Sequence, residues 1–182
     1  LEQIAGHSVA WVDSSSAAGY VYPRLQLAAH GIDPSTAFQE EVFLRSHEAV
    51  VRAVLDRAVD LGATYVLLDP ASPRKVIRAG WRPFPPGVDT SPIQWFDPFG
   101  PLPPDVIATR CEVSNSMACS LGDAFQRIHQ EKAIVEVMRR HFGTDRFVQP
   151  THRIYDLIRQ AMDQAEGSGI EVALSLRPSR PL

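Results

Sequence analysis

"HSVAWVDSSSAAGYVYP", residues 7–23, joins a short apolar run to the start of an amphipathic segment. The apolar run at 7–13 predicts a β-strand, and the segment from about Ala17 to Ala29 predicts a helix. Three serines, Ser14–Ser16, fill the junction between them. A helix N-terminus has backbone N–H groups without partners and favours negative charge. The serines therefore either cap the helix or help its N-terminus to hold an anion.

The alternation of strand and helix continues further along the chain. A second strand is predicted at 38–46, and a second helix from His47 to Gly62. Residues 63–69 form a continuous apolar run, which is typical of a strand covered on both faces. This βαβαβ order predicts an α/β fold with a parallel sheet and right-handed crossovers.

The second half of the chain has a different character. Ten of the fifteen prolines lie at 70–104, which predicts a loop with short extended pieces around 93–96. The other expected elements are a strand-like piece at 105–111, helices at 120–143 and 151–165, and a tail at 170–182 that either adds a strand or frays.

Composition and charge exclude several classes of partner. The 182 residues carry a formal net charge of −3, which makes nucleic acid and anionic membranes poor candidates. No apolar run approaches the ~20 residues that span a bilayer. The first residues lack the basic region of a signal peptide. Because the chain begins with Leu1, we interpret it as a processed product or an excised piece.

Motifs that carry reaction chemistry are scarce. Cys111 and Cys119 match no zinc pattern, and a local disulfide and two free thiols are both open interpretations. The sequence contains no nucleophile elbow, zinc-protease motif, P-loop or dinucleotide-binding motif. A hydrolase that uses Ser16, His47 and a carboxylate is disfavoured because no motif orients these residues. We therefore predict neither an enzyme nor a cofactor nor a metal site.

Five stretches carry a resemblance to a known family: "VDSSSAAGYVYP", "HGIDP", "RSHEAVVRAVLDRAVDLGATY", "PLPPDVIATR" and "FGTDRFVQPTHRIYDLI". In this order they resemble the phosphate-, phosphite- and phosphonate-binding proteins of ABC importers, which have the type II periplasmic binding fold. The resemblance implies a complete second lobe at 1–95, with a parallel-rich sheet flanked by helices. It implies that 96–182 hold the hinge return and the C-terminal helices of a first lobe whose N-terminal part is missing.

The resemblance also implies a ligand site at the serine junction. In the family, three loop positions donate hydroxyl and amide hydrogen bonds to an oxyanion. Ser16 matches the first position, whereas Ala17 and Ala18 keep only their backbone N–H groups. Each lost hydrogen bond costs on the order of 1 kcal/mol, so two losses weaken binding by ~10- to 100-fold. Ser15 and Gly19 are the other ligand-binding candidates in this loop.

Three further residues match polar positions of the family site. His47 is implied to donate to a ligand oxygen, and the helix dipole favours its neutral form, although a histidine here can also be a surface residue. Asp105 is implied to accept a hydrogen bond from a protonated ligand oxygen. Asp69 follows the third predicted strand, where open sheets bind ligands, but a turn carboxylate is the preferred alternative. Three aromatic residues are expected in the core rather than in a pocket: Tyr20, Trp81 and Trp95.

Two functions follow from the resemblance and the residues. The first is a periplasmic or otherwise extracytoplasmic solute-binding protein, which holds a phosphonate-, phosphite- or phosphate-type oxyanion for an ABC permease. The second is a sensor or interaction domain derived from that family, which Ala17, Ala18 and the proline-rich segment favour. Because the first lobe is incomplete, the helices at 120–165 need cover from the second lobe, from another subunit, or from a second copy by domain exchange.

Overall fold

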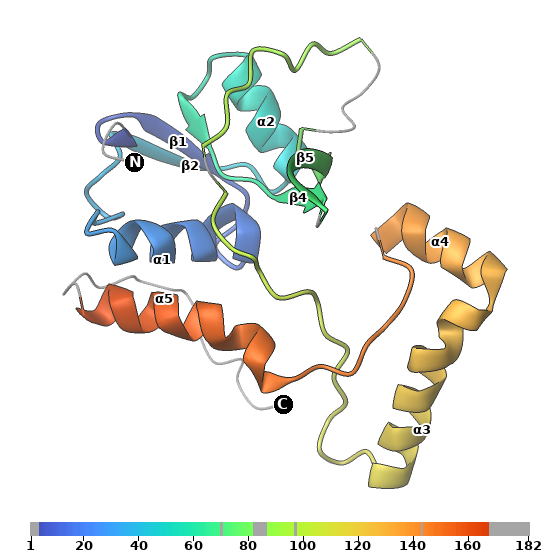
Figure 1. The fold of residues 1–182 in the computed structure, drawn as a ribbon. Coiled ribbons are helices and arrows are strands. Elements are labelled where there is room, and N and C mark those ends of the chain that lie inside the picture. Colours follow the sequence, from blue (N-terminus) through green and yellow to red (C-terminus); the bar gives the residue numbers. More distant parts are fainter. Residues whose placement is uncertain (1–3, 70, 82–86, 97, 143, 168–182) are drawn as a thin grey trace. The chain divides into compact units, whose positions relative to one another are not determined.

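The computed structural model describes residues 4–69, 71–81, 87–96, 98–142 and 144–167. The chain divides into two compact units. The sheet unit comprises Leu1–Leu102 with Asp156–Leu182, and the helical unit comprises Pro103–Tyr155. Figure 1 shows the elements of both units along the chain.

A three-stranded parallel sheet forms the centre of the sheet unit. Strand β1 (Ser8–Trp11) lies between β2 (Glu40–Phe43) and β3 (Leu61–Gly62), and both neighbours run parallel to it. The helix α2 (His47–Leu55) connects β2 to β3. The α/β fold class with a parallel sheet flanked by helices is thereby confirmed.

The first helix begins with an unusual turn. Residues Ala17–Val21 form a single π-helical turn, and α1 (Tyr22–Ala29) continues from it with Pro23 in its first turn. Pro is tolerated there because the first helical N–H groups have no acceptor within the helix. Gly31 ends the helix with a φ of +77°, a backbone conformation that glycine adopts without strain.

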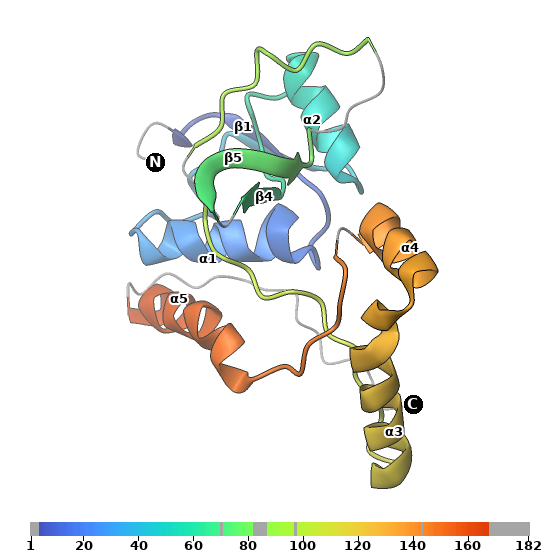
Figure 2. The same cartoon turned by 45° about the vertical axis from the view of Figure 1, so that its right-hand side comes forward.

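Both faces of the parallel sheet are covered by apolar side chains. On one face, Ala10 and Val12 of the β1 region pack with Val50 of α2. On the other, Trp11 packs with Tyr20, so Tyr20 belongs to the core as expected. The helix α5 (Asp156–Gly167) also belongs to this unit: Ala165 packs against α1, and Figures 1 and 2 show the two helices side by side.

The predicted third strand at 63–69 is wrong in two respects. The third parallel strand, β3, lies just before this range at Leu61–Gly62, and β4 (Val66–Asp69) turns away to form an antiparallel hairpin with β5 (Ser72–Ala79). Strand β5 lies in the proline-rich segment and was expected to be loop. A strand with Pro73 is tolerated here because β5 is an edge strand, and the hairpin gains a core with Val51 and Trp81.

The helical unit contains α3 (Asn115–Arg127), a 3-10 turn at Ile128–Gln130 and α4 (Lys132–Phe142). The helices are close to the prediction, but α3 begins five residues earlier because Ser114 caps it by accepting a hydrogen bond from Met117 N. The strand expected at 105–111 is absent, since the described residues of this unit include no strand with which it could pair. The predicted helix at 151–165 begins as a 3-10 turn, His152–Tyr155, and the tail at 170–182 lies outside the described residues.

Candidate functional site

The carboxyl ends of the three parallel strands bring three loops together. Leu44 N donates to Trp11 O (2.9 Å), and Arg45 N donates to Val12 O (2.7 Å), which holds the loop after β2 against the loop after β1. Ala63 N donates to Ala10 O (3.0 Å), which places the residues after β3 on the opposite side of β1. Open α/β sheets bind their ligands at such an edge.

The loop after β1, residues 13–16, is the serine loop. Ser16 Oγ accepts a hydrogen bond from Gly19 N (3.1 Å) and so caps the helical turn that follows. Gly19 is needed here because a Cβ at this position would lie 2.4 Å from Cγ2 of Val12. The capping role proposed for the serines is therefore present for Ser16, and its hydroxyl hydrogen is still available to a ligand.

Ser15 is engaged by a carboxylate of the same loop. Its backbone N and its Oγ both donate to Asp13 Oδ1, at 3.0 and 2.7 Å. These hydrogen bonds lower the pKa of Asp13, and Arg45 lies 3.6 Å from the other carboxylate oxygen. An anion bound at the loop must compete with Asp13 for Ser15. Ala17 and Ala18 begin the helical turn, where backbone N–H groups have no acceptor within the helix.

His47 lies at the N-terminus of α2, next to the cap residue Ser46, whose Oγ accepts from Ala49 N (3.1 Å). The imidazole Nδ1 lies 2.9 Å from Thr64 Oγ1, and the ring meets Tyr65 edge-to-face with centroids 4.8 Å apart. Burial lowers the pKa of His47, which favours the neutral imidazole at neutral pH. A neutral imidazole can still donate one hydrogen bond.

The sequence reasoning missed Thr64 and Tyr65. Both follow β3, whereas the sequence pattern placed them inside the strand predicted at 63–69 and so gave no sign of a position in a loop. The end of β5 fixes Thr64 closely, because a Cβ at Gly80 would lie 1.8 Å from Thr64 Oγ1.

The two predicted aspartates do not belong to the parallel sheet or its loops. Asp69 belongs to the β4–β5 hairpin, where its carboxylate accepts from Ala71 N (3.0 Å) and from Lys75 Nζ (3.1 Å), as the turn alternative expects. Asp105 is exposed and belongs to the helical unit. The structure therefore brings Ser15–Gly19 and His47 to one edge of one sheet and places Asp69 in the other sheet. Ligand binding by any of these residues stays a prediction.

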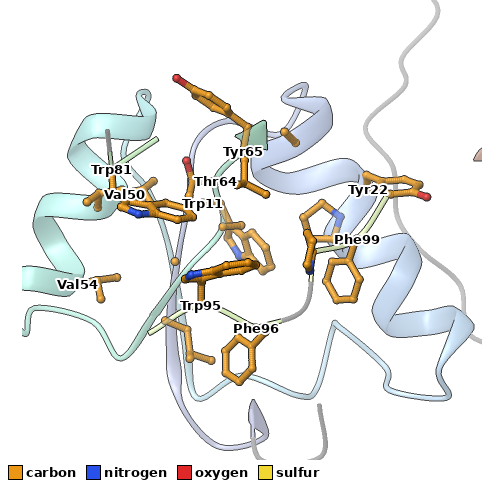
Figure 3. A pocket seen from close by; sticks show the side chains of 18 of the residues that line it. Trp11, Tyr22, Val50, Val54, Thr64, Tyr65, Trp81, Trp95, Phe96 and Phe99 are labelled. Carbon is orange, nitrogen blue, oxygen red and sulfur yellow. The ribbon is translucent and has the colours of Figure 1, made fainter. Parts of the chain in front are cut away.

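A cavity of about 740 Å³ lies within the sheet unit, beside these loops. Ala18, Thr64 and Tyr65 line it, together with aromatic side chains that include Trp81 and Trp95. Figure 3 shows Thr64 and Tyr65 at one end of the view and Phe96 at the other. Trp81 and Trp95, which were expected in the core, thus face a cavity, although Trp81 is itself buried.

Within the described ranges no group of three His, Cys, Asp or Glu side chains is placed to hold a metal ion. Cys111 and Cys119 are both free and exposed. No helix among the described residues has the length and apolar character required to cross a bilayer.

A helix-flanked parallel sheet with polar loops at its carboxyl edge is consistent with the type II periplasmic binding fold. A sequence model of a family described as "ABC transporter, phosphonate, periplasmic substrate-binding protein" matches residues 1–155, so the chain belongs to that family. The family implies a small ligand, an ABC permease partner and a location outside the cytoplasm. A search of curated proteins found no significant match.

Proposed function

We propose that this protein binds a phosphonate-, phosphite- or phosphate-type oxyanion between the serine loop and His47, and presents it to an ABC permease without chemical change. The observation that carries this proposal is that two helix N-termini lie at the carboxyl ends of neighbouring parallel strands, β1 and β2. Helix N-termini supply N–H donors and partial positive charge, which suit a tetrahedral oxyanion.

We propose a small set of donors to the oxyanion: the hydroxyl of Ser16, the backbone N–H groups of Ala17 and Ala18, and the imidazole of His47. The guanidinium of Arg45 lies 3.6 Å from Asp13 and adds a positive charge at the same loop. The carboxylate of Asp13 stands in the same loop and repels a fully ionised ligand. The small number of donors and the charge of Asp13 favour modest affinity for the oxyanion. We propose Asp105 as the acceptor for a protonated ligand oxygen.

A second candidate function is a sensor or interaction domain with weakened oxyanion binding. The engagement of Ser15 by Asp13 favours it, because this serine offers its N–H and its hydroxyl to the protein rather than to a ligand.

We further propose that 1–95 correspond to the second lobe and 96–182 to the hinge return and first-lobe helices. Several large apolar side chains of the helical unit are exposed, which supports completion of that lobe by a second copy or another subunit: Met117, Leu121, Ile134 and Val137.

Isothermal titration calorimetry with methylphosphonate, phosphite and phosphate tests the binding proposal. We expect His47→Ala to weaken the binding of methylphosphonate by at least about 10-fold, because a hydrogen bond to an anion is lost. His129→Ala, a change at an exposed histidine of the helical unit, is the matched control and should leave affinity unchanged. Unchanged affinity of His47→Ala would contradict the assigned site. Absence of binding of all three anions would favour the sensor alternative.

Phosphorus NMR separates binding from catalysis. Methylphosphonate incubated with the protein should show the same resonance after many hours, since a binding protein returns its ligand unaltered. Appearance of an inorganic phosphate resonance would contradict the proposal.

A further inference from the structure

The cavity beside the serine loop has the character of a site for an organic group. Its volume of about 740 Å³ falls in the range of small-molecule pockets, which are mostly apolar with a few placed polar groups. Trp11, Trp81 and Trp95 line it, and the rings of Trp81 and Trp95 lie 6.3 Å apart with planes inclined by 36°. Figure 3 shows these rings gathered around one space.

Polar groups that could orient a ligand lie at one end of this cavity, and that end touches the candidate oxyanion site. Thr64 and Tyr65 line the cavity and are also the two residues that contact the imidazole of His47. Ala18, in the turn that follows the serine loop, lines the cavity as well. A ligand held by Ser16 and His47 therefore has apolar space directly beside it.

The lining of the cavity is mostly apolar and carries little charge. Asp60 is the only acidic residue among its described lining residues. The carboxylate of Asp60 accepts hydrogen bonds from Ser8 N (2.9 Å) and Ser8 Oγ (2.8 Å), and His7 lies 3.6 Å away. An ammonium group placed among the apolar lining residues would lose hydration that these side chains do not replace.

We propose that the cavity seats the organic substituent of the ligand, so that the protein takes phosphonates with an uncharged apolar substituent, aromatic ones above all. This inference rests on the proposed oxyanion site. Phe96 and Trp95 then act as specificity-determining residues: their side chains are 55% and 42% exposed in the structure, and a bound ring would cover them.

A strand of polypeptide is the competing occupant. The outer edge of β3 also lines the cavity, and strands add to free sheet edges. Two observations favour the small ligand: β3 offers an edge of only two residues, and the polar end of the cavity adjoins His47.

Calorimetry with four phosphonates on the full 182-residue chain tests this inference. We expect benzylphosphonate to bind at least about 10-fold more tightly than methylphosphonate, because it removes more apolar surface from water. We expect propylphosphonate to bind more tightly than its near-isostere 2-aminoethylphosphonate, which carries an ammonium group in place of the methyl group.

Matched phenylalanine variants locate the effect. Phe96→Ala should reduce the preference for benzylphosphonate while it leaves the affinity for methylphosphonate in place. Phe43→Ala changes a phenylalanine that is 45% exposed and lies outside the cavity, and it should preserve the preference.

The results distinguish a failure of the inference about the cavity from a failure of the proposed oxyanion binding. Equal affinities for benzylphosphonate and methylphosphonate would overturn the inference, leave the oxyanion site standing and favour a polypeptide occupant of the cavity. A preference for 2-aminoethylphosphonate would overturn it as well. If no phosphonate and no inorganic phosphate binds, the proposed function itself fails, and the inference fails with it.

Discussion

At the scale of single residues, Gly80 controls the candidate site without facing a ligand itself. A side chain at Gly80 would overlap the hydroxyl of Thr64, and that hydroxyl is the partner of His47. We expect Gly80→Ala to lower the free energy of unfolding by about 1–3 kcal/mol, since overpacking forces neighbours to move. Because Thr64 must shift, oxyanion affinity should fall too.

Chemical denaturation and calorimetry check both effects of Gly80→Ala. Gly122→Ala is the control: a Cβ there meets nothing within 4 Å, and Gly122 lies inside α3. That control should stabilise the protein by about 0.5–1 kcal/mol, because alanine favours helix interiors. Wild-type affinity in Gly80→Ala would contradict the link through Thr64.

His47 also predicts how stability depends on pH. Its pKa is lowered by burial in the folded chain, whereas in the unfolded chain it titrates near 6.5. As the pH falls below 6.5, His47 becomes protonated in the unfolded state but stays neutral in the folded state. The free energy of unfolding therefore decreases. Below the pKa of His47 in the folded chain, both states are protonated, and the stability that neutral His47 contributed at high pH is fully lost.

Urea denaturation from pH 8 to pH 5 measures this contribution. His47→Gln should show a flatter decline than the wild-type chain over that range, whereas His129→Gln should decline in parallel with it. Parallel curves for wild type and His47→Gln would contradict the assigned burial effect.

At the scale of elements, a buried ion pair joins α1 to β2. Arg24 of α1 is 5% exposed, and its guanidinium contacts the carboxylate of Glu41 on β2. The indole N–H of Trp11 donates to the same carboxylate at 2.6 Å. Arg24 is buried but the Glu41 side chain is 29% exposed, so water can partly compensate the charge left by Glu41→Gln. This substitution should cost about 1–3 kcal/mol of stability.

Thermal or urea unfolding measures the cost of Glu41→Gln. The adjacent Glu40 is exposed, and Glu40→Gln should change stability by no more than about 0.5 kcal/mol. An equal loss of stability in Glu41→Gln and Glu40→Gln would show that the ion pair with Arg24 makes no specific contribution to stability.

The elements differ in how well their sequences predicted them. Strands β1 and β2 and helices α1 and α2 carry clear local signals: apolar period, caps and a C-terminal glycine. The structure places β3 just before the predicted strand at 63–69 and β4 at its end. Strand β4 depends on pairing with β5, which the local pattern does not reveal because the segment of β5 is rich in proline. The strand expected at 105–111 failed for the same reason, because a strand forms only where another strand can pair with it.

The residues of the candidate site also differ in whether local sequence signals or tertiary contacts determine their positions. Ser16 and His47 could be located from the sequence because each stands at a helix start after a strand. Thr64 could not be located from the sequence, because its contact with His47 and its close packing against Gly80 both depend on the tertiary structure. Asp13 was missed because its hydrogen bonds with Ser15 depend on the conformation of the serine loop.

At the scale of the whole molecule, the exposed apolar side chains of α3 and α4 predict association. If a second copy completes the helical unit, molar mass from light scattering should rise with protein concentration. Val137→Glu, at a position that is 53% exposed, should abolish that rise by placing a charge in the contact. Leu67→Glu, at a position that is 44% exposed on β4, is the control and should leave it intact. A single mass at every concentration would contradict domain exchange.

The packing of α5 on α1 has a consequence for how the chain is made. Leu25 and Ala28 of α1 are synthesised more than a hundred residues before Ala165, which covers them. The stretch matched by the family ends at residue 155, so the covering helix lies beyond it. A ribosome that stalls before α5 would release a chain with its sheet formed and α1 unprotected. The face of α1 therefore stays open to aggregation until α5 has been made.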